Sequence, residues 1–144
     1  MEKIQEYYKN NQLKAEGNII HHKKTGLWTY YYENGSKFRE INYQEGIENG
    51  TWLMWHENGN LYLEENKLNG KTNGLWKEFY EDGKIKEIGE YIENEYSPKD
   101  FWDEDGNQLL KNGTGKKIEK FGAGGIDIFE HYFQDGKLVK EIRL

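Results

Sequence analysis

The stretch that decides the fold runs from Gly26 to Tyr91 and contains the same pattern three times. The copies are Gly26-Leu27-Trp28 with Asn34-Gly35, Gly50-Thr51-Trp52 with Asn58-Gly59, and Gly74-Leu75-Trp76 with Asp82-Gly83. Each copy begins 24 residues after the previous one. A fixed period of this length is typical of proteins built by stacking one supersecondary unit. The chain is therefore expected to be an array, and its function is expected to lie on the surface that stacking creates.

Within each copy, an Asn-Gly or Asp-Gly pair separates two runs rich in aromatic and aliphatic residues, which predicts a β-hairpin. If the pair is a two-residue type I′ turn, both of its residues need positive φ, which Gly adopts freely and Asn or Asp tolerates. That turn predicts a register. The predicted pairs are Glu33–Ser36, Tyr32–Lys37, Tyr31–Phe38, Tyr30–Arg39 and Trp28–Ile41 in the first copy, Trp55–Tyr62 and Met54–Leu63 in the second, and Tyr80–Ile85 in the third.

A single hairpin is marginally stable in water, so the copies are expected to pair edge to edge into one sheet. The polar connectors Gln44-Glu45-Gly46 and Asn69-Gly70-Lys71 are predicted to be turns at the edge opposite to the Asn-Gly turns. Trp28 and Tyr31 are three residues apart, which places them on opposite faces of a regular strand. Either both faces of the sheet carry aromatic rings, or a bulge reorients one of the two positions.

The segments that flank the regular copies follow the same unit less closely. Residues 1–25 resemble a degenerate copy that caps the array, with Asn10-Asn11 in place of the Asn-Gly turn; a frayed terminus is the alternative. In residues 98–144 we expect divergent hairpins: a fourth copy with one residue deleted at Asp105-Gly106, an irregular hairpin in residues 107–125, and a last hairpin at Asp135-Gly136. The prediction is one all-β domain over residues 1–144, with three regular repeats in 26–97. Its fold is an extended, twisted antiparallel meander of stacked hairpins.

The composition limits the classes of function. The formal net charge is −6, and the chain has no cysteine. An acidic chain argues against non-specific binding to nucleic acid or to an anionic membrane surface, and the missing cysteines exclude disulfides and thiolate metal sites. The first residues contain no apolar segment typical of a secretion signal, so a cytoplasmic protein is expected. Aromatic residues make up 15% of the chain, so large rings are expected to supply much of the buried surface.

No reactive motif accompanies this pattern. The four histidines, His21, His22, His56 and His131, lie outside any His-Glu-x-x-His or Gly-x-Ser-x-Gly arrangement. His21 and His22 are expected to alternate faces of a strand, which would prevent them from binding one metal ion together. The glycine-rich segments 111–115 and 122–125 lack the Gly-Lys-Ser or Gly-Lys-Thr sequence of a phosphate loop. The chain is therefore predicted not to be an enzyme and to need no metal or cofactor.

Two rows of side chains are the candidate binding residues. The residue two positions before each turn glycine is acidic in four successive copies, and stacked hairpins repeat about every 10 Å because each contains two strands. The predicted acidic ladder consists of Glu33, Glu57, Glu81 and Glu104, joined by Asp82 and Asp105. The second row consists of the rings of Tyr31, Trp55 and Phe79. The ladder suits a basic protein partner and aromatic rings are frequent interface anchors; solubility and core packing are the alternative roles.

The pattern Gly26-x-Trp28-x-x-Tyr31-Tyr32-x-Asn34-Gly35, followed by Glu40-x-x-Tyr43 and Gly46 and repeated from Gly50 and Gly74, resembles the MORN-repeat variant family of bacterial proteins. The resemblance covers residues 1–97 well and the remainder loosely. It implies a twisted sheet of hairpins and an antitoxin or immunity protein that neutralises a neighbour-encoded toxin by direct binding. A structural scaffold or self-assembling module is the alternative function, and a membrane-associated module is a further one. The chain departs from the family pattern in its period, in its C-terminal residues, and at Lys86, where earlier copies have Phe38 and Tyr62.

Overall fold

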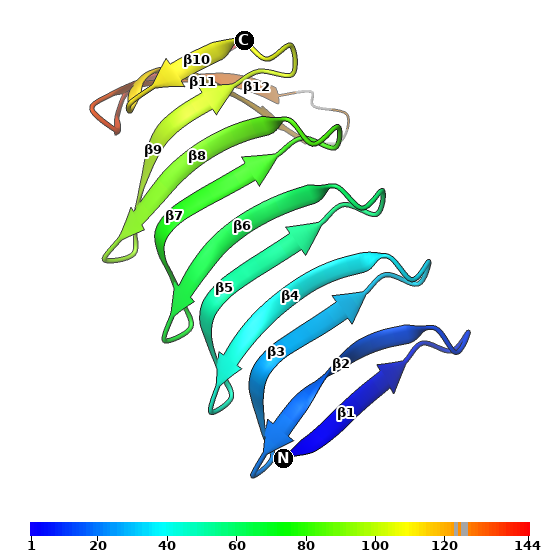
Figure 1. Cartoon of the computed structure of the whole chain (residues 1–144). Helices are drawn as coiled ribbons and strands as arrows, with labels where there is room; N and C mark the ends of the chain where they lie inside the picture. Colours follow the sequence, from blue (N-terminus) through cyan, green and yellow to red (C-terminus); the bar gives the residue numbers. More distant parts are fainter. Residues whose placement is uncertain (123, 125–126) are drawn as a thin grey trace.

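A computed structural model of the chain describes residues 1–122, 124 and 127–144, so the glycine-rich segment 122–125 lies partly outside the described residues. All of the described elements are β-strands, and they form one open antiparallel sheet in the order β1 to β13 (Figure 1). The strands are β1 Glu2–Tyr7, β2 Leu13–Ile20, β3 Lys23–Tyr31, β4 Lys37–Gln44, β5 Ile47–Trp55, β6 Leu61–Leu68, β7 Lys71–Phe79, β8 Ile85–Ile92, β9 Glu95–Trp102, β10 Gln108–Lys111, β11 Thr114–Phe121, β12 Asp127–Gln134 and β13 Lys137–Arg143. The predicted fold class, an all-β meander of hairpins, is confirmed. The described part of the chain holds no helix that is long and apolar enough to cross a membrane.

The Asn-Gly turns differ from the predicted two-residue type. In the first regular copy the Tyr32 amide donates to the Ser36 carbonyl and the Gly35 amide donates to the Tyr32 carbonyl, so three residues form the loop. Gly35 has a φ of 86°, whereas Asn34 lies outside the positive-φ region. Instead, Asn34 Oδ1 accepts a 2.8 Å hydrogen bond from the Ser36 amide. The asparagine therefore serves as a short side-chain acceptor, and only the glycine needs positive φ.

The same acceptor bond occurs at the equivalent turns of the other copies. It joins Asn10 Oδ1 to the Gln12 amide at 3.0 Å, Asn58 Oδ1 to the Asn60 amide at 2.9 Å and Asp82 Oδ1 to the Lys84 amide at 2.9 Å. At the first of these turns Asn11 takes the place of the glycine, with a φ of 65°. Residues 1–20 therefore contain a complete hairpin, β1–β2, with the same turn as the regular copies.

A one-residue bulge compensates for the longer loop. Tyr31 pairs with Lys37 and Tyr30 pairs with Arg39, so Phe38 is the extra residue. The pairs predicted beyond the bulge are confirmed: Tyr30–Arg39, Trp28–Ile41 and Met54–Leu63. The pairs predicted beside the turns are wrong because they assumed the shorter loop: Glu33–Ser36, Tyr32–Lys37, Tyr31–Phe38, Trp55–Tyr62 and Tyr80–Ile85.

Two-residue turns do occur, at the opposite edge of the sheet. Both central residues have positive φ in His21-His22, Glu45-Gly46, Asn69-Gly70, Glu93-Asn94, Asn112-Gly113 and Asp135-Gly136. The predicted turns at this edge are therefore confirmed, and they have the type I′ signs that were expected at the other edge. The predicted placement of His21 and His22 on a strand is wrong, because these two residues are themselves a turn.

The sequence left open whether Trp28 and Tyr31 lie on opposite faces or a bulge reorients one of them. In the structure, aromatic rings lie on both faces of the sheet. Trp28, Trp52 and Trp76 are on one face, called here the tryptophan face, and Trp28 packs beside Tyr30 with ring centroids 6.2 Å apart. Tyr31 points to the other face, where its hydroxyl donates to Glu16 Oε1 at 3.1 Å. Trp28 is 2% exposed, so the tryptophan face carries the core of the regular copies.

Trp28 is accommodated by a glycine on the neighbouring strand. Glu16 pairs with Thr29 and Asn18 pairs with Thr25, so the single residue Gly17 lies opposite three residues of β3. The Trp28 indole Nε1 donates to the Asn18 carbonyl at 2.9 Å and fixes the ring above Gly17. A Cβ atom at position 17 would lie 2.3 Å from Trp28 Cδ2, a separation that the packed ring cannot tolerate without moving.

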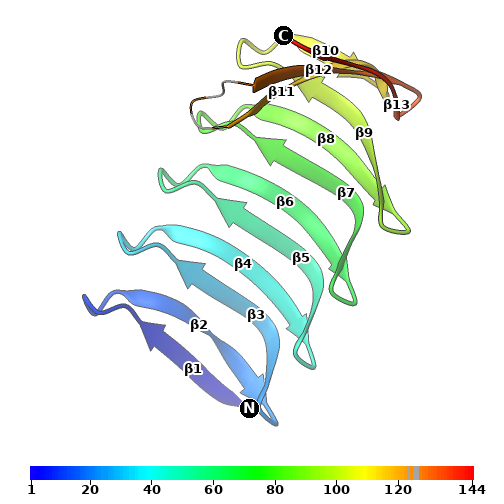
Figure 2. The same cartoon turned by 180° about the vertical axis from the view of Figure 1, so that it is seen from behind.

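The strands β11–β13 do not continue the plane of the sheet. The short strand β10 pairs with β11 only at Leu110–Gly115 and Lys111–Thr114. Beyond Gly115, β11 lies across the end of the sheet and also contacts β9 (Figures 1 and 2). Leu110 and Phe101 are 0% and 2% exposed, so this fold-back forms a second small core. The sequence predicted hairpins here but not the fold-back.

Replacing Gly17 by Ala is expected to lower the free energy of unfolding by about 1–3 kcal/mol, because the added methyl group overpacks the site of Trp28. Urea denaturation followed by tryptophan fluorescence measures this change. Glu6→Ala, at an exposed position of the neighbouring strand, is the control and should change stability by less than about 0.5 kcal/mol. Equal stability of Gly17→Ala and the parent protein would contradict the packing.

Alkaline pH is expected to destabilise the fold. Burial is the main cause of a raised pKa at six tyrosines: Tyr31, Tyr32, Tyr43, Tyr62, Tyr80 and Tyr96. For Tyr80 the pKa rises from 10.0 to about 12, with nearby Glu104 and Asp103 as further causes. A raised pKa in the folded state means that the stabilisation is complete below the unfolded pKa and is lost as the pH rises through the folded pKa.

Urea denaturation at fixed pH values should therefore show stability falling between pH 10 and pH 12. Tyrosinate absorbance of the folded protein should rise over the same interval, later than that of the urea-unfolded chain. Identical titration curves for the folded and unfolded protein would be inconsistent with buried hydroxyl groups.

Candidate functional site

The turns at the Asn-Gly edge are tied to one another by a bond that recurs in every copy. The hydroxyl of Tyr8 donates to the Tyr31 carbonyl at 2.7 Å, that of Tyr32 to the Trp55 carbonyl at 2.8 Å, and that of Tyr80 to the Trp102 carbonyl at 2.7 Å. His56 Nε2 takes the same place 3.3 Å from the Phe79 carbonyl. These bonds attach each turn to the first strand of the following copy and hold the edge in a fixed spacing.

A second side chain stacks on each of these rings. Phe38 packs on Tyr32 and Tyr62 packs on His56, with ring centroids 4.9 Å apart in both pairs. In the third copy the partner of Tyr80 is Lys86, whose Nζ lies 5.9 Å from the ring centroid. The lysine that departs from the repeat pattern therefore replaces an aromatic contact with a cation–π contact, and the stack of turns continues.

The acidic ladder lies on this edge. Glu33, Glu57, Glu81, Asp82 and Glu104 are all exposed, and they occupy successive turns. The turns are in direct contact: the Ser36 hydroxyl donates to the Glu57 carbonyl at 3.1 Å, and the Asn58 side-chain amide donates to the Glu81 carbonyl at 2.8 Å. The predicted geometry of the ladder is thus present, while its role in binding stays a prediction.

The ladder is only partly neutralised by neighbouring cations. Asp82 forms an ion pair with Lys84 at 2.9 Å, which holds the pKa of the Asp82 carboxyl below its usual value, and Glu104 pairs with Lys120 at 3.1 Å. Within the described residues, Glu33, Glu57 and Glu81 have no ion-pair partner. These three carboxylates, called here the acidic edge, form a run of uncompensated negative charge over three copies.

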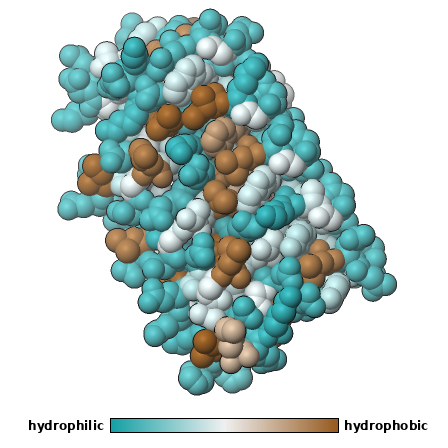
Figure 3. Space-filling model, viewed as in Figure 1, coloured by the Kyte–Doolittle hydropathy of each residue, from teal (hydrophilic) through white to brown (hydrophobic). Residues whose placement is uncertain are grey.

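The aromatic row lies beside the acidic edge on the face opposite to the tryptophan face. The side chains of Tyr31, Trp55 and Phe79 are half-buried, and each stands two residues before a carboxylate of the ladder. Lys37 places its Nζ 5.2 Å from the Trp55 ring centroid. Figure 3 shows apolar side chains in separate patches on a mostly hydrophilic surface. Because Tyr31, Trp55 and Phe79 are half-buried, only part of each ring is open to a partner beside the acidic edge.

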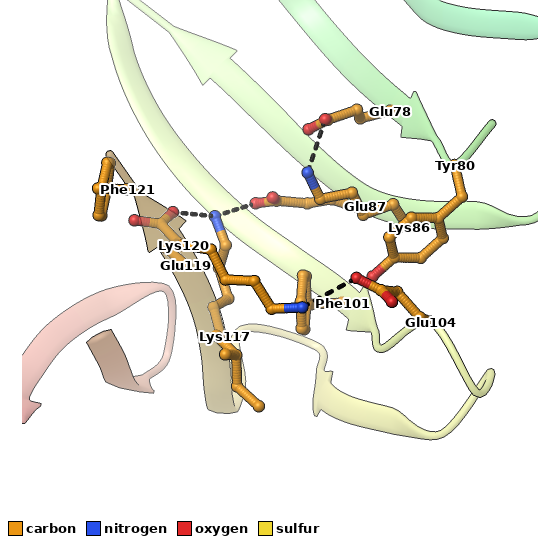
Figure 4. Close-up of a pocket in the computed structure, with 11 residues that line it drawn as sticks. Glu78, Tyr80, Lys86, Glu87, Phe101, Glu104, Lys117, Glu119, Lys120 and Phe121 are labelled. Carbon is orange, nitrogen blue, oxygen red and sulfur yellow. Dashed lines mark hydrogen bonds and ion pairs between the residues drawn. The ribbon is translucent and has the colours of Figure 1, made fainter. Parts of the chain in front are cut away.

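A cleft of about 330 Å³ lies where β11 crosses the end of the sheet (Figure 4). Its charged side chains are paired with one another. Glu87 and Lys117 are 2.6 Å apart, and Lys117 also contacts Glu119 at 3.2 Å. Further ion pairs join Lys86 to Glu78 at 2.7 Å and Lys120 to Glu104 at 3.1 Å. Because these charges are paired with one another, the residues of the cleft are better explained as the ion-paired contact that holds β11 to β8 than as a binding site.

The network of hydrogen bonds and ion pairs around Lys117 extends to β13. The Tyr96 hydroxyl donates to Glu87, and burial together with Glu87 raises the pKa of Tyr96. On the other side, His131 lies 3.1 Å from Glu119 and 2.7 Å from Glu141. The result is a line of polar contacts from Tyr96 through Glu87, Lys117, Glu119 and His131 to Glu141. Among the described residues, no group of three His, Cys, Asp or Glu side chains is arranged to hold a metal ion.

Sequence reasoning found the edge but missed what fixes it. The spacing of Tyr8, Tyr32, His56 and Tyr80 by 24 residues was visible in the sequence and could have identified the bonds between turns. The contact of Lys117 with Glu87 had no such signal, because the two residues lie outside any shared repeat position and meet only when β11 folds back.

Replacing Lys117 by Met is expected to lower the free energy of unfolding by about 3–5 kcal/mol, because Glu87 would remain buried and unpaired. Glu87 is 3% exposed and Lys117 is 6% exposed. The matched control is Lys120→Met, which breaks the solvent-exposed pair with Glu104 and should change stability by at most about 1 kcal/mol. Urea denaturation of both variants measures the two changes in stability. Equal changes would contradict a stabilising buried ion pair between Lys117 and Glu87.

A comparison with protein families agrees with the observed repeats. The model of a family described as MORN repeat variant matches residues 3–21, 24–45, 48–66 and 72–93, which together are more than half of the chain. Each match covers one hairpin, from β1–β2 to β7–β8. No curated protein matches the chain significantly. MORN repeats are in general protein- or membrane-binding modules, and the family is not a family of enzymes.

Proposed function

The chain belongs to the MORN repeat variant family, and we propose that it is a non-enzymatic binding protein of the antitoxin or immunity type. It acts in the cytoplasm and neutralises a toxin, encoded by a neighbouring gene, by covering part of the toxin's surface. The observation that carries the proposal is the acidic edge. Glu33, Glu57 and Glu81 are exposed, lie on stacked turns and have no ion-pair partner among the described residues.

Three carboxylates on turns of fixed spacing have a physical consequence for association. Like charges on neighbouring turns repel one another, and a basic surface that approaches the edge relieves that repulsion. Charge complementarity of this kind accelerates encounter and selects the orientation of the partner more than it adds affinity. Since the turns are already held by hydrogen bonds between copies, little conformational entropy remains to be lost on binding.

The aromatic row supplies the second element of an interface. Charged rims surround apolar anchors in stable protein complexes, and Tyr and Trp are enriched among the residues that contribute most to binding. Tyr31, Trp55 and Phe79 are half-buried next to the acidic edge, so a partner that contacts Glu33 and Glu57 also reaches these rings. The combination favours a folded protein over a flexible polyanion or an anionic membrane as the binding partner.

The direct test is purification of the tagged protein from its own host, followed by identification of the bound protein and measurement of its toxicity with and without this chain. The proposal expects a neighbour-encoded partner in a one-to-one complex and loss of toxicity. Light scattering across concentration tests the alternative scaffold function. Concentration-dependent assembly without a second protein would overturn the proposal in favour of a self-assembling module.

Changing Glu33, Glu57 and Glu81 together to Gln is expected to lower the association rate constant with that partner about tenfold at low salt, with a smaller effect at high salt. The matched control changes three exposed carboxylates at the other edge, Glu45, Glu93 and Glu95, to Gln and alters net charge equally. Stopped-flow or surface plasmon resonance measures both. Equal slowing in the two variants would show that overall charge acts, rather than the acidic edge.

A further inference from the structure

Partly or fully buried cations in this protein are nearly always paired with a carboxylate. Six of the eight Lys and Arg residues that are not exposed lie 2.5–3.2 Å from a carboxylate oxygen. The pairs are Lys67–Glu65, Lys77–Glu64, Lys86–Glu78, Lys99–Glu90, Lys116–Glu130 and Lys117–Glu87. The other two are Lys24 and Arg39, and no carboxylate in the described part of the chain lies within 4.0 Å of either.

Both unpaired cations lie on the tryptophan face, and both contact Tyr30. Lys24 Nζ donates to the Tyr30 hydroxyl at 2.6 Å and lies 4.2 Å from the centroid of the Trp28 ring. The guanidinium carbon of Arg39 lies 4.5 Å from the centroid of the Tyr30 ring, on the strand that pairs with β3. Tyr43 completes the group, with its ring centroid 5.3 Å from Lys24 Nζ. Two positive charges thus share one aromatic surface.

Arg39 is also the residue whose hydrogen bonding is incomplete. Its Nε is buried and has no hydrogen-bond partner, which holds for no other buried side-chain nitrogen or oxygen in the described residues. A guanidinium group has five donors in a planar fork, and burying one of them without an acceptor is unfavourable. An outside group cannot reach the buried Nε, but the two Nη atoms of the same guanidinium are neither buried nor hydrogen-bonded within the described residues, so they can donate to an acceptor from outside the chain.

We propose that Lys24 and Arg39 form a binding site for a carboxylate, supplied by an Asp or Glu side chain of the protein partner. The fork of a guanidinium matches the two oxygens of a carboxylate, and the ammonium group of Lys24 adds a second charge-assisted donor. The rings of Trp28, Tyr30 and Tyr43 exclude water from one side of the site. This inference rests on the proposed function and adds that the partner places one acidic side chain on the tryptophan face.

Charge favours a single carboxylate over a larger anion. The chain has a net charge of −6, and the acidic edge repels polyanions. Lys24 and Arg39 together carry two positive charges, which one or two carboxylate oxygens of an otherwise basic protein surface can approach without bringing further negative charge to the sheet. The repeat itself does not require a cation at this position, since Leu63 occupies the position 24 residues after Arg39.

The first test uses the free protein. Its Arg39 Nε–H signal is followed by nuclear magnetic resonance while sodium acetate replaces sodium chloride at constant ionic strength. The expected result is a saturable shift, weakened at least about tenfold in Lys24→Gln. Absence of a saturable shift, or an unchanged acetate affinity in Lys24→Gln, would overturn the site. Inorganic phosphate is titrated in parallel, and tighter binding of phosphate than of acetate by tenfold or more would overturn the assignment to a carboxylate.

A stability measurement separates binding from packing. Arg39→Leu should leave the melting temperature unchanged or raise it, because no hydrogen bond or ion pair is lost and the leucine side chain packs on Tyr30 and Phe38 in place of the guanidinium. The same substitution should abolish the acetate response. The matched control is Lys67→Leu, which breaks the pair with the buried Glu65 and should lower the melting temperature. A lower melting temperature for Arg39→Leu, comparable to that of Lys67→Leu, would make Arg39 a structural residue and overturn the proposal.

The last test uses the complex with the partner. Arg39→Leu should weaken binding of the identified partner at least about tenfold, whereas Lys116→Leu, which removes a half-buried cation in β11 away from the acidic edge, the aromatic row and Arg39, should not. If the parent protein binds no partner, the proposed function fails while the acetate titration still decides the site. If the partner binds Arg39→Leu as tightly as the parent protein, the inference fails and the proposed function stands.

Discussion

The structure depends on holding one hairpin to the next in a sheet that has no second layer. Most β-proteins bury the apolar face of a sheet against another sheet or a helix, and here neighbouring copies must serve instead. The bond from Tyr8, Tyr32, His56 and Tyr80 to the carbonyl of the next copy does this at one edge. Its sequence separation is 23 residues in three copies and 22 in the fourth. The bond therefore survives the deletion of one residue before Asp105-Gly106, and the array keeps its spacing.

The predictable part of the fold is the part encoded locally. Turn glycines, aromatic pairs and the 24-residue period fix the number, order and direction of the strands, because each depends on residues close in sequence. The turn type was wrong because Asn34 and Gly35 fit two different loops, and only the bond from the Ser36 amide to Asn34 Oδ1 favours the longer one. The predicted register is nevertheless correct beyond the turn, because the bulge at Phe38 cancels the extra loop residue. The fold-back at Gly115 could not be predicted, since it depends on Lys117 meeting Glu87 across two intervening strands.

The candidate site also has a part that the sequence predicts and a part that it does not. The acidic edge was predictable because a repeat places equivalent residues at a constant spacing, and Glu33, Glu57 and Glu81 follow that spacing. The unpaired cations were not predictable, because Lys24 and Arg39 occupy positions at which the next copy has Glu48 and Leu63. A departure from a repeat becomes informative only when the neighbours of the side chain are known. Lys86 also departs from the repeat, and its contacts with Tyr80 and Glu78 show that it completes the stack.

An acidic edge and a pair of cations on the tryptophan face constrain how a partner can lie. In the proposed complex the acidic edge faces a basic surface and Lys24 and Arg39 bind an acidic side chain, so a partner that satisfies only one of the two leaves charges unpaired. An unpaired charge in a desolvated interface costs desolvation free energy. That cost disfavours other proteins and also the correct partner in a wrong orientation, so it discriminates strongly between partners. Within this chain, the equivalent hairpins share the same turns and the same register. Specificity must therefore come from side chains that break the repeat, and Lys24 and Arg39 are such side chains on the tryptophan face.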